Sequence, residues 1–559
     1  MATDYLSDLM EKTKSQSNEP KKKEKEAEEE SKEDFTKVAN TQNMEALKRI
    51  VESSKEKKDE DDDVPDHGEY EKEMESMKKI ELKSYGKTRI FEIPGQALKY
   101  YYVPTSRPTA SERKVINTIK EATTRLISIA PYKVRNADER RVVYKQKVID
   151  IIKTNPSLKI PTSRVSFYAD AVVREMVGYG LIDDLIKDDN LEEIMVVSPK
   201  KPVYVFHREF EMMTTNIEFY SEQEIEDLVN KIAREIGRRV DVSMPLLDAR
   251  LIDGSRVNAT IPPASISGGT LTIRKFRADP YSIIDLVRFG TISSEAAAFL
   301  WVAVDGFGTK PANMLISGGT GSGKTTLLNV LASFIPERER IITIEDTAEL
   351  NLPLDHWIRL EARPPGLEGS GEIRMDILTK NSLRMRPDRI IVGEIRHEEA
   401  FTFFTAINTG HDGCLGTVHA NSPEETIVRV TSPPMNVPNI MLTGLDIIIV
   451  EHRYYDRKKG TIRRISEIAE VTGGMEGHPK AQTIFQRDPI TDTLERTLID
   501  SRYLKELQMF TGLSKAKIEA ELKIRETFFE GLVERNIRDL KQVSSEAKEF
   551  ILKRKIIGA

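Results

Sequence analysis

The residues with the clearest chemical potential form a glycine-rich segment that ends in a lysine and a threonine. Its pattern is Gly318-x-x-x-x-Gly323-Lys324-Thr325, between an apolar run and a helical pattern. Glycines let backbone N–H groups approach phosphate oxygens, and a following helix N-terminus adds a positive partial charge. Lys324 suits the β- and γ-phosphates, and the Thr325 hydroxyl suits Mg²⁺. The segment therefore predicts a site for ATP with Mg²⁺. The predicted nucleotide-binding residues of this segment are Gly318, Gly319, Thr320, Gly321, Ser322, Gly323, Lys324, Thr325 and Thr326.

Hydrolysis also needs acidic groups, and two apolar runs downstream end in carboxylates. Glu345 and Glu349 follow the run 341–344, and Glu394 follows the run 389–392. Carboxylates at the C-terminal ends of parallel strands lie where α/β proteins bind ligands. One of them is able to orient or deprotonate the attacking water, and another orders the water shell of Mg²⁺. An acidic strand end alone is more typical of a surface loop, but beside the phosphate-binding segment these residues are candidate catalytic acids.

Two histidines flank a short apolar run. His411 precedes and His419 follows residues 415–418, and the single cysteine, Cys414, lies beside them. Neutral imidazoles at these positions are able to sense a γ-phosphate, although a lone histidine is more often a satisfied core residue. No thiolate or carboxylate cluster accompanies them, so they do not predict a metal pair. Cys414 is expected to pack as a small apolar group.

Arginines near a turn are further candidates for the site. Arg250 and Arg256 flank the turn signal 253–255, and Arg274 follows in the next apolar run. An arginine placed on a γ-phosphate adds transition-state stabilisation. Exposed arginines are usually only solvated, so Arg250 and Arg256 are predictions that need the tertiary structure.

The elements that must position these residues alternate between strand and helix from about residue 295 onward. Apolar runs at 314–317, 341–344 and 389–392 are typical of parallel strands that are covered on both faces, and a helix is expected at 326–334. Residues 515–552 have strong helical character after the N-cap candidate Ser514. The pattern predicts an α/β fold for this part of the chain.

The N-terminal half has a different pattern. We predict a charged, largely disordered tail at 1–79, a strand and helical region at 80–190, and an α+β (PAS-like) domain at 191–279. A linker at 280–294 and an ATPase domain with a helical C-terminal part at 295–559 complete the expected organisation.

Composition narrows the functional classes. The chain has 559 residues, 31% of them charged, and a formal net charge of −6. A slightly acidic chain does not favour nucleic acid as its main partner. No run approaches the length of a membrane-spanning helix, and the N-terminus lacks a signal-peptide pattern. One cysteine forms no intrachain disulfide and no zinc pair.

Taken together, the motifs resemble those of the type II/type IV secretion ATPase superfamily over about residues 170–475. The phosphate-binding segment, an aspartate box, a Gly-Glu second acidic motif and a histidine box occur in that order. The resemblance implies a homohexamer with an N-terminal domain and a RecA-like ATPase domain. It also implies the roles of individual residues. These are Glu349 as the catalytic glutamate, Glu394 as the Walker B acid that contacts Mg²⁺ through water, Glu345 in the aspartate box, His411 and His419 in the histidine box, and Arg250 and Arg256 near the arginines that reach nucleotide.

Within the superfamily the sequence resembles the archaeal branch and, there, the archaellum (archaeal flagellum) motor ATPases. The stretches 359–365 and 431–438 carry this resemblance, and the charged N-terminus fits it. Archaeal pilus-assembly ATPases share much of it. His397 departs from the Asp or Gly of relatives. The four-cysteine zinc module of many bacterial type II secretion ATPases is absent, which argues against that subtype.

The expected function is that of a cytoplasmic ATPase, peripheral at the inner face of the cell membrane, that powers a filament machine. The resemblance implies a polytopic membrane platform protein and accessory motor proteins as partners, with no direct nucleic acid. A nucleic-acid motor, a nucleotide-gated structural subunit with little hydrolysis, and a small-molecule kinase are the alternatives. The first would need a basic pore or stacking aromatics, which the sequence does not show clearly.

Overall fold

The computed structural model describes a large part of the chain in two compact units. The described residues are 69–104, 110–126, 137–155, 158, 160–251, 253–276, 279–363, 365, 370–456, 460–473 and 478–554. The first unit comprises Met1–Val205, Met212–Val240 and Thr260–Leu271, and the second comprises Phe206–Glu211, Asp241–Ala259 and Thr272–Ala559. Most of the predicted disordered tail lies outside the described residues. The last part of that tail, residues 69–79, is not disordered as predicted. It contains helix α3 (Glu69–Ser76), whose Met74 is buried.

A nine-stranded sheet is built by the described residues of the N-terminal half. Its strand order is β1-β2-β3-β6-β5-β4-β9-β8-β7. The strands are β1 (Ile80–Tyr85), β2 (Thr88–Glu92), β3 (Lys99–Tyr102), β4 (Leu191–Val196), β5 (Pro202–His207), β6 (Glu211–Glu218), β7 (Leu246–Arg250), β8 (Arg256–Thr260) and β9 (Thr270–Arg274). The first three strands join the sheet through the parallel pair of β3 and β6. They therefore belong with the α+β part, although the sequence grouped them with the helical region. Burial of Tyr100 and Tyr101 accounts for this placement.

Three helices of the N-terminal half pack on one another, namely α4 (Ala110–Leu126), α5 (Ala137–Thr154) and α6 (Val165–Met176). The helices α7 (Asp183–Lys187) and α8 (Glu222–Glu235) lie outside their buried cluster. Ile116 and Ile119 of α4, Val148 of α5 and Val172 of α6 share one buried cluster. Apolar residues at helical spacing form this cluster, as the sequence predicted for the region.

The second unit contains a sheet of nine strands in the order β12-β11-β13-β14-β10-β15-β16-β17-β18. The strands are β10 (Met314–Gly318), β11 (Ile341–Glu345), β12 (Trp357–Glu361), β13 (Arg389–Val392), β14 (Leu415–Val418), β15 (Ile447–Asp456), β16 (Gly460–Gly473), β17 (Pro479–Asp488) and β18 (Thr493–Arg496). Neighbours from β12 to β15 pair in parallel, and the remaining pairs are antiparallel. The predicted α/β, RecA-like fold is confirmed.

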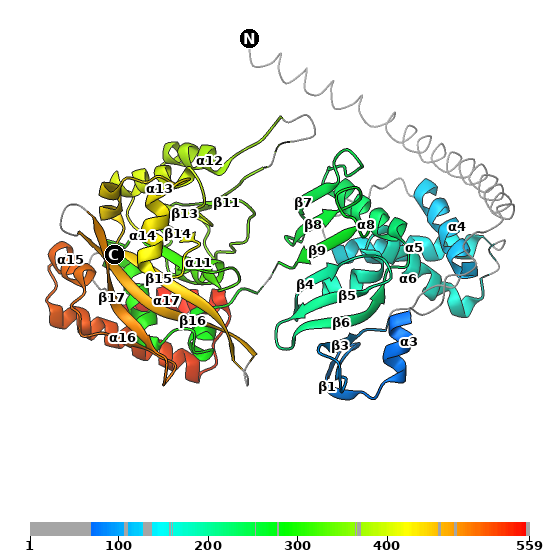
Figure 1. Cartoon of the computed structure of the whole chain (residues 1–559), viewed down its shortest axis with the longest axis horizontal. Coiled ribbons are helices and arrows are strands. Elements are labelled where there is room, and N and C mark those ends of the chain that lie inside the picture. The colour runs from blue at the N-terminus through cyan, green and yellow to red at the C-terminus, as the bar shows by residue number, and fades with distance from the viewer. Residues whose placement is uncertain are drawn as a thin grey trace, which may run out of the picture. The chain divides into compact units, whose positions relative to one another are not determined.

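Helices cover both faces of this sheet (Figure 1). They are α9 (Ile283–Arg288), α10 (Ser294–Asp305), α11 (Lys324–Ala332), α12 (Met375–Ser382), α13 (Glu399–Asn408), α14 (Pro423–Thr431), α15 (Arg502–Thr511), α16 (Lys515–Glu534) and α17 (Leu540–Arg554). Met314 and Ile316 of β10 enter one core cluster, whereas Leu315 enters the other. Alternation along a strand sends neighbouring side chains to opposite faces, so β10 is anchored from both sides.

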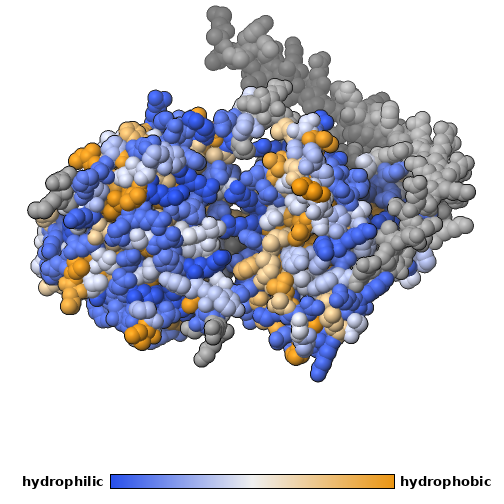
Figure 2. Space-filling view, viewed as in Figure 1, coloured by the Kyte–Doolittle hydropathy of each residue, from blue (hydrophilic) through white to orange (hydrophobic). Residues whose placement is uncertain are grey.

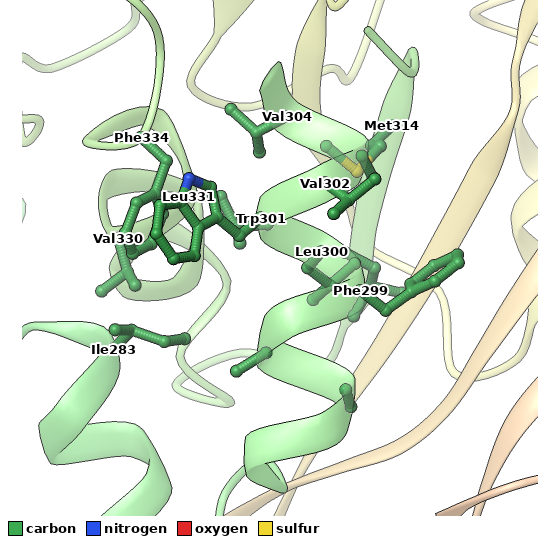
Figure 3. Close-up of a cluster of buried hydrophobic side chains, with 14 of the residues drawn as sticks. Ile283, Phe299, Leu300, Trp301, Val302, Val304, Met314, Val330, Leu331 and Phe334 are labelled. Atoms are coloured by element: carbon green, nitrogen blue, oxygen red, sulfur yellow. The ribbon is translucent and has the colours of Figure 1, made fainter. Parts of the chain in front are cut away.

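Trp301 is the largest fully buried side chain of the first of these clusters. It projects from α10 toward Leu331 and Phe334 (Figure 3), and its ring centroid lies 5.4 Å from that of Phe334. The contact packs α10 against the end of α11, the helix that follows the phosphate-binding segment. On the face seen in Figure 2, hydrophilic residues cover most of the described surface of each unit.

Two expected boundaries differ from the structure. Residues 280–294, expected as a linker, contain α9, and its Ile283 and Ile284 are buried in the core of the second unit. Ser282 and Asp285 form a capping box that starts this helix. The helical character expected at 515–552 is present as two helices, and the chain turns between them at Asn536, whose φ of 55° is left-handed.

Candidate functional site

The glycine-rich segment connects β10 directly to α11, as the sequence predicted. Gly323 has a φ of 114° and Gly321 a φ of 71°, conformations that other residues rarely adopt. A Cβ on Gly318 would lie 2.2 Å from the carbonyl oxygen of Glu451, so close approach also requires glycine there. A Cβ on Gly319 would meet nothing nearer than Asn421, at 3.8 Å. Three of the four glycines are therefore required by backbone geometry or by space.

Lys324 is the first residue of α11 and is buried at 8% exposure. Its Nζ donates to the carbonyl oxygens of Gly318 and Gly319, both at 2.9 Å, and lies 3.4 Å from Nδ1 of His419. Burial lowers the pKa of Lys324, while the carboxylates of Glu394 and Glu451 oppose that effect. The loop thus holds an ammonium group at a helix N-terminus, where anions bind.

Thr325 and Thr326 follow Lys324 in the first turn of α11. Both are partly exposed, whereas Ser322 is buried and its hydroxyl has no hydrogen-bond partner among the described residues. Thr320 is exposed at the outer part of the loop. A hydroxyl, as on Thr325, and a carboxylate, as on Glu394, are oxygen donors of the kind that Mg²⁺ prefers. Groups of three or more His, Cys, Asp or Glu residues that could hold a metal ion are absent from the described residues.

Glu394 lies just beyond the end of β13, between His419 and Arg396. Its Oε1 is 2.6 Å from Nε2 of His419, and its Oε2 accepts a hydrogen bond from Arg396 at 2.5 Å. Burial raises the pKa of Glu394, but Arg396, His419 and Lys324 outweigh burial and lower it overall. Burial and the positive charge of Lys324 lower the pKa of His419. The neutral imidazole of His419 therefore lies between the cation of Lys324 and the anion of Glu394.

Glu345 ends β11 and points inward. Its Oε1 accepts the backbone N–H groups of Glu349 and Leu350 at 2.8 and 2.9 Å, and burial raises its pKa to about 7. Gly393 makes room for it, because a Cβ there would lie 3.0 Å from its Cγ. Glu345 thus holds the loop that carries Glu349. The side chain of Glu349 is 33% exposed, and its Oε1 lies 3.7 Å from Arg274.

The two predicted arginines have carboxylate partners in the second unit. Arg250 Nη1 lies 3.7 Å from Oε2 of Glu361. Arg256 Nη2 donates to Asp248 at 2.9 Å, and this hydrogen bond raises the pKa of Arg256. Their assignment to nucleotide stays a prediction.

The two histidines lie at opposite ends of β14. His411 precedes the strand, and its Nδ1 lies 3.2 Å from the carbonyl oxygen of Ala406 at the end of α13. Seven residues separate it from His419, and four of them form β14, which by itself is roughly 13 Å long. The expectation that His411 contacts nucleotide does not fit this position, because β14 carries His411 to the other edge of the sheet. Cys414 is fully buried there, as expected.

Sequence reasoning overlooked three charged residues of the site. Arg396 contacts Glu394, Arg463 on β16 donates through Nε to the carbonyl oxygen of Gly321 at 3.0 Å, and Glu451 on β15 lies under the loop. The available signal was weak. Glu451 ends the apolar run 447–450 as Glu345 ends 341–344, but no recognisable motif surrounds it.

This geometry defines a P-loop site in a RecA-like domain, and comparison with known proteins places the chain in a family. Residues 175–461 match the family described as Type II/IV secretion system protein, and the chain belongs to that family. Two similar proteins come from Methanocaldococcus jannaschii. The uncharacterized protein MJ0781 is 34% identical over 539 residues, which covers 65% of this chain and 74% of MJ0781. The uncharacterized protein MJ0900 is 31% identical over 479 residues, which covers 81% of this chain and 85% of MJ0900.

A solved structure also matches part of the chain. It is the VirB11 ATPase from the Brucella suis type IV secretion system in complex with sulphate, with 27% identity and a TM-score of 0.26 over 51% of this chain and 90% of that one. None of the helices among the described residues is long and apolar enough to cross a membrane.

Proposed function

We propose that this chain is an ATPase that binds Mg-ATP in the 318–326 loop and hydrolyses it. The observation that carries the proposal is the contact series Lys324–His419–Glu394, which sets a cation, a neutral imidazole and an anion beside a glycine-rich loop at a helix N-terminus. Phosphates suit the cationic end, and a carboxylate next to it is placed for the water or the metal shell. Membership of a family with a known secretion ATPase among its solved relatives supports the assignment.

Each residue has a distinct role in the proposed hydrolysis. The loop amides and Lys324 would bind the β- and γ-phosphates, and Thr325 and Glu394 would hold Mg²⁺, Glu394 by way of water. Magnesium, when bound, neutralises charge on the phosphates. Glu349 and Glu394 orient the attacking water, and Arg250 and Arg256 are candidates for stabilising charge on the transferred group. His419 contacts both Lys324 and Glu394, so loss of the γ-phosphate changes the partner of Lys324 and is felt at Glu394.

The biological role that we propose is a homohexameric motor for an archaeal type IV pilus-like filament. The chain would act at the cytosolic face of the membrane with a polytopic platform protein and accessory motor proteins. The finer subtype is the archaellum motor ATPase, of the kind called FlaI or ArlI, which assembles or rotates the filament. A pilus-assembly or secretion ATPase of the same family fits the relatives equally well. A nucleic-acid motor is the alternative of another class, and DNA-stimulated, salt-sensitive turnover would favour it.

Turnover measurements on a matched pair of lysine variants test the activity. Lys324→Ala removes the only loop cation, so we expect phosphate release from Mg-ATP to fall at least 1,000-fold. Lys505→Ala makes the same change on exposed α15, where Lys505 pairs with Asp500 at 3.6 Å, and should leave the rate within twofold. Unchanged turnover in Lys324→Ala would refute the site.

Native membranes provide the test of the partner. The full chain and a version lacking residues 1–67 are each used to capture proteins from detergent extracts. Recovery of a polytopic protein and of pilus-like subunits by the full chain supports the filament role. Recovery of secretion components instead would assign the alternative subtype.

A further inference from the structure

A buried carboxyl group lies directly beneath the phosphate-binding loop. Glu451 belongs to β15, where it is the parallel neighbour of Gly318 on β10. On its other side it pairs with Ile465 of β16, at a point where the register shifts. Only 2% of Glu451 is exposed, although the three residues after it, starting with His452, reach the surface at least in part. The carboxyl group is therefore enclosed by the sheet and the loop.

The loop touches this carboxyl group at a glycine. A Cβ on Gly323 would lie 2.6 Å from Oε1 and 3.1 Å from Oε2 of Glu451, so no side chain fits between them. Gly323 directly precedes Lys324, and its backbone forms part of the cradle for phosphates. The carboxyl group of Glu451 and a bound phosphate would thus lie on opposite sides of one thin stretch of backbone.

Cations near Glu451 are engaged elsewhere. Lys324 faces it from α11 but donates to the carbonyl oxygens of Gly318 and Gly319. Arg463 faces it from β16 but donates through Nε to Gly321. Within the described part of the chain Oε2 has no hydrogen-bond partner. Burial is the main effect on this group and raises the pKa of Glu451 to about 8, with only partial opposition from Arg463 and Lys324. The carboxyl group is therefore protonated at neutral pH.

We propose that Glu451 is a positioning residue that must carry its proton when phosphates occupy the loop, so that nucleotide binding takes up a proton at alkaline pH. This inference rests on the proposed function of the loop. Low-polarity surroundings screen charge poorly. An ionised Glu451 would therefore place a poorly screened negative charge next to the negative charges of the nucleotide. Because proton binding and nucleotide binding are linked, a nucleotide that repels ionised Glu451 raises the pKa of Glu451. The nucleotide also binds more weakly at pH values where Glu451 is ionised.

The neutral form has a clear structural advantage over an apolar side chain. It fills the space under Gly323 with a group that is able to donate one hydrogen bond, and the hydroxyl of nearby Ser322 also has no partner among the described residues. A carboxyl group beneath the loop makes nucleotide affinity respond to pH, whereas a leucine or a glutamine there would not.

Calorimetric titration with Mg-ADP tests the proposal, because ADP binds without hydrolysis. Titrations at about pH 6.5, 7.5, 8.5 and 9.0 in two buffers of different protonation enthalpy give the affinity and the number of protons taken up. We expect the wild-type chain to take up protons increasingly above about pH 8, and its affinity to fall by up to about tenfold per pH unit there. Glu451→Gln keeps the shape of the neutral form, so its affinity should be nearly independent of pH over that range.

Glu467→Gln is the matched control. Glu467 lies on the adjacent strand β16, burial raises its pKa as well, and its contact is with Thr483 rather than with the loop. This variant should take up protons like the wild type. Glu345, whose pKa is about 7, contributes equally to all three proteins, so the difference between Glu451→Gln and the wild type isolates Glu451.

Each outcome bears on a different statement. Equal proton uptake by the wild type and Glu451→Gln overturns the inference while leaving the nucleotide site intact. Absence of Mg-ADP binding to the wild type at every pH overturns the proposed function itself. If Glu451→Gln does not fold, Glu451→Leu, which also lacks the titrating group, takes its place in the same titrations. Proton uptake by that variant equal to the uptake by the wild type overturns the inference.

Discussion

Two buried clusters of charge in the second unit differ in how their partners are arranged. On α16, Arg525 is 1% exposed, donates to Asp305 at 2.6 Å and to Glu521 at 3.2 Å, and its guanidinium carbon lies 4.5 Å from the ring centroid of Trp301. At the loop, Lys324 donates to two backbone carbonyls and lies 3.4 Å from Nδ1 of His419, and Oε2 of Glu451 has no hydrogen-bond partner within the described part of the chain. The first cluster is complete within the protein.

The difference separates a structural cluster from a binding site. A buried ion pair that is fully hydrogen-bonded fixes the packing of its elements, and removing one partner leaves an uncompensated charge. The ammonium group of Lys324, at a helix N-terminus and beside a neutral carboxyl group, is arranged for a ligand that supplies negative charge. The comparison predicts that stability and nucleotide binding respond to different residues.

The largest effect is expected at the structural cluster. Arg525→Ala leaves Asp305 buried without its ion partner and Glu521 with Arg554 as its remaining partner, so we expect the free energy of unfolding to fall by about 3–5 kcal/mol. Binding of Mg-ADP to the folded fraction should change less than twofold. Chemical denaturation and calorimetry measure the two quantities. Arg535→Ala, which removes a surface pair with Glu546, should lower stability by less than about 1 kcal/mol. If Arg525→Ala lost ADP affinity in proportion to its loss of stability, the distinction between the structural cluster and the binding site would be wrong.

Glu394→Gln addresses the site directly. It removes the anion that contacts His419 and Arg396, so we expect ATP turnover to fall about 100- to 1,000-fold while Mg-ADP still binds. Steady-state phosphate release and calorimetry provide the readouts. Glu398→Gln, on the exposed side of the same loop, should keep the wild-type rate. Equal losses in both variants would point to a change in the loop rather than to a catalytic carboxylate.

The two ends of β14 give an internal comparison. His419→Ala removes the imidazole that contacts both Lys324 and Glu394, so turnover should fall about 10- to 100-fold. His411→Ala removes a contact with the Ala406 carbonyl, so stability should fall by about 1 kcal/mol and the turnover of the folded protein should hold within twofold. Turnover and thermal unfolding of both variants check this. A loss of turnover greater than twofold in His411→Ala would indicate that His411 belongs to the nucleotide site.

The smallest effect concerns the pH dependence of stability. Burial raises the pKa of Glu345 from 4.5 to about 7, so between these values the folded chain binds more protons than the unfolded chain. The contribution of Glu345 is full below pH 4.5 and is lost as pH rises toward about 7. Glu345→Gln should therefore flatten the stability profile in this window. Denaturation from pH 5 to 8 measures it, and an unchanged slope would contradict the burial of a protonated Glu345.

Much of the fold was predictable because its signals are local. The strands at 314–317, 341–344 and 389–392 are continuous apolar runs, and the structure has strands at all three positions. The prediction was wrong where residues that favour turns and apolar residues occur in the same segment. Residues 280–294 contain Pro280 and Gly290, which favour a linker, yet the apolar Ile283 and Ile284 bind this segment to the core of the second unit.

The sequence by itself determined the conformation of the phosphate-binding loop, because glycines with positive φ, a preceding strand and a following helix lie within about twenty consecutive residues. It also indicated that Glu345 and Glu394 end strands. Only the tertiary structure decided which charged groups meet at the loop. Glu451 reaches Gly323 because β15 pairs beside β10, and His419 rather than His411 reaches Lys324 because a strand has two ends. Contacts of this kind depend on strand order and register, which no short stretch of sequence specifies.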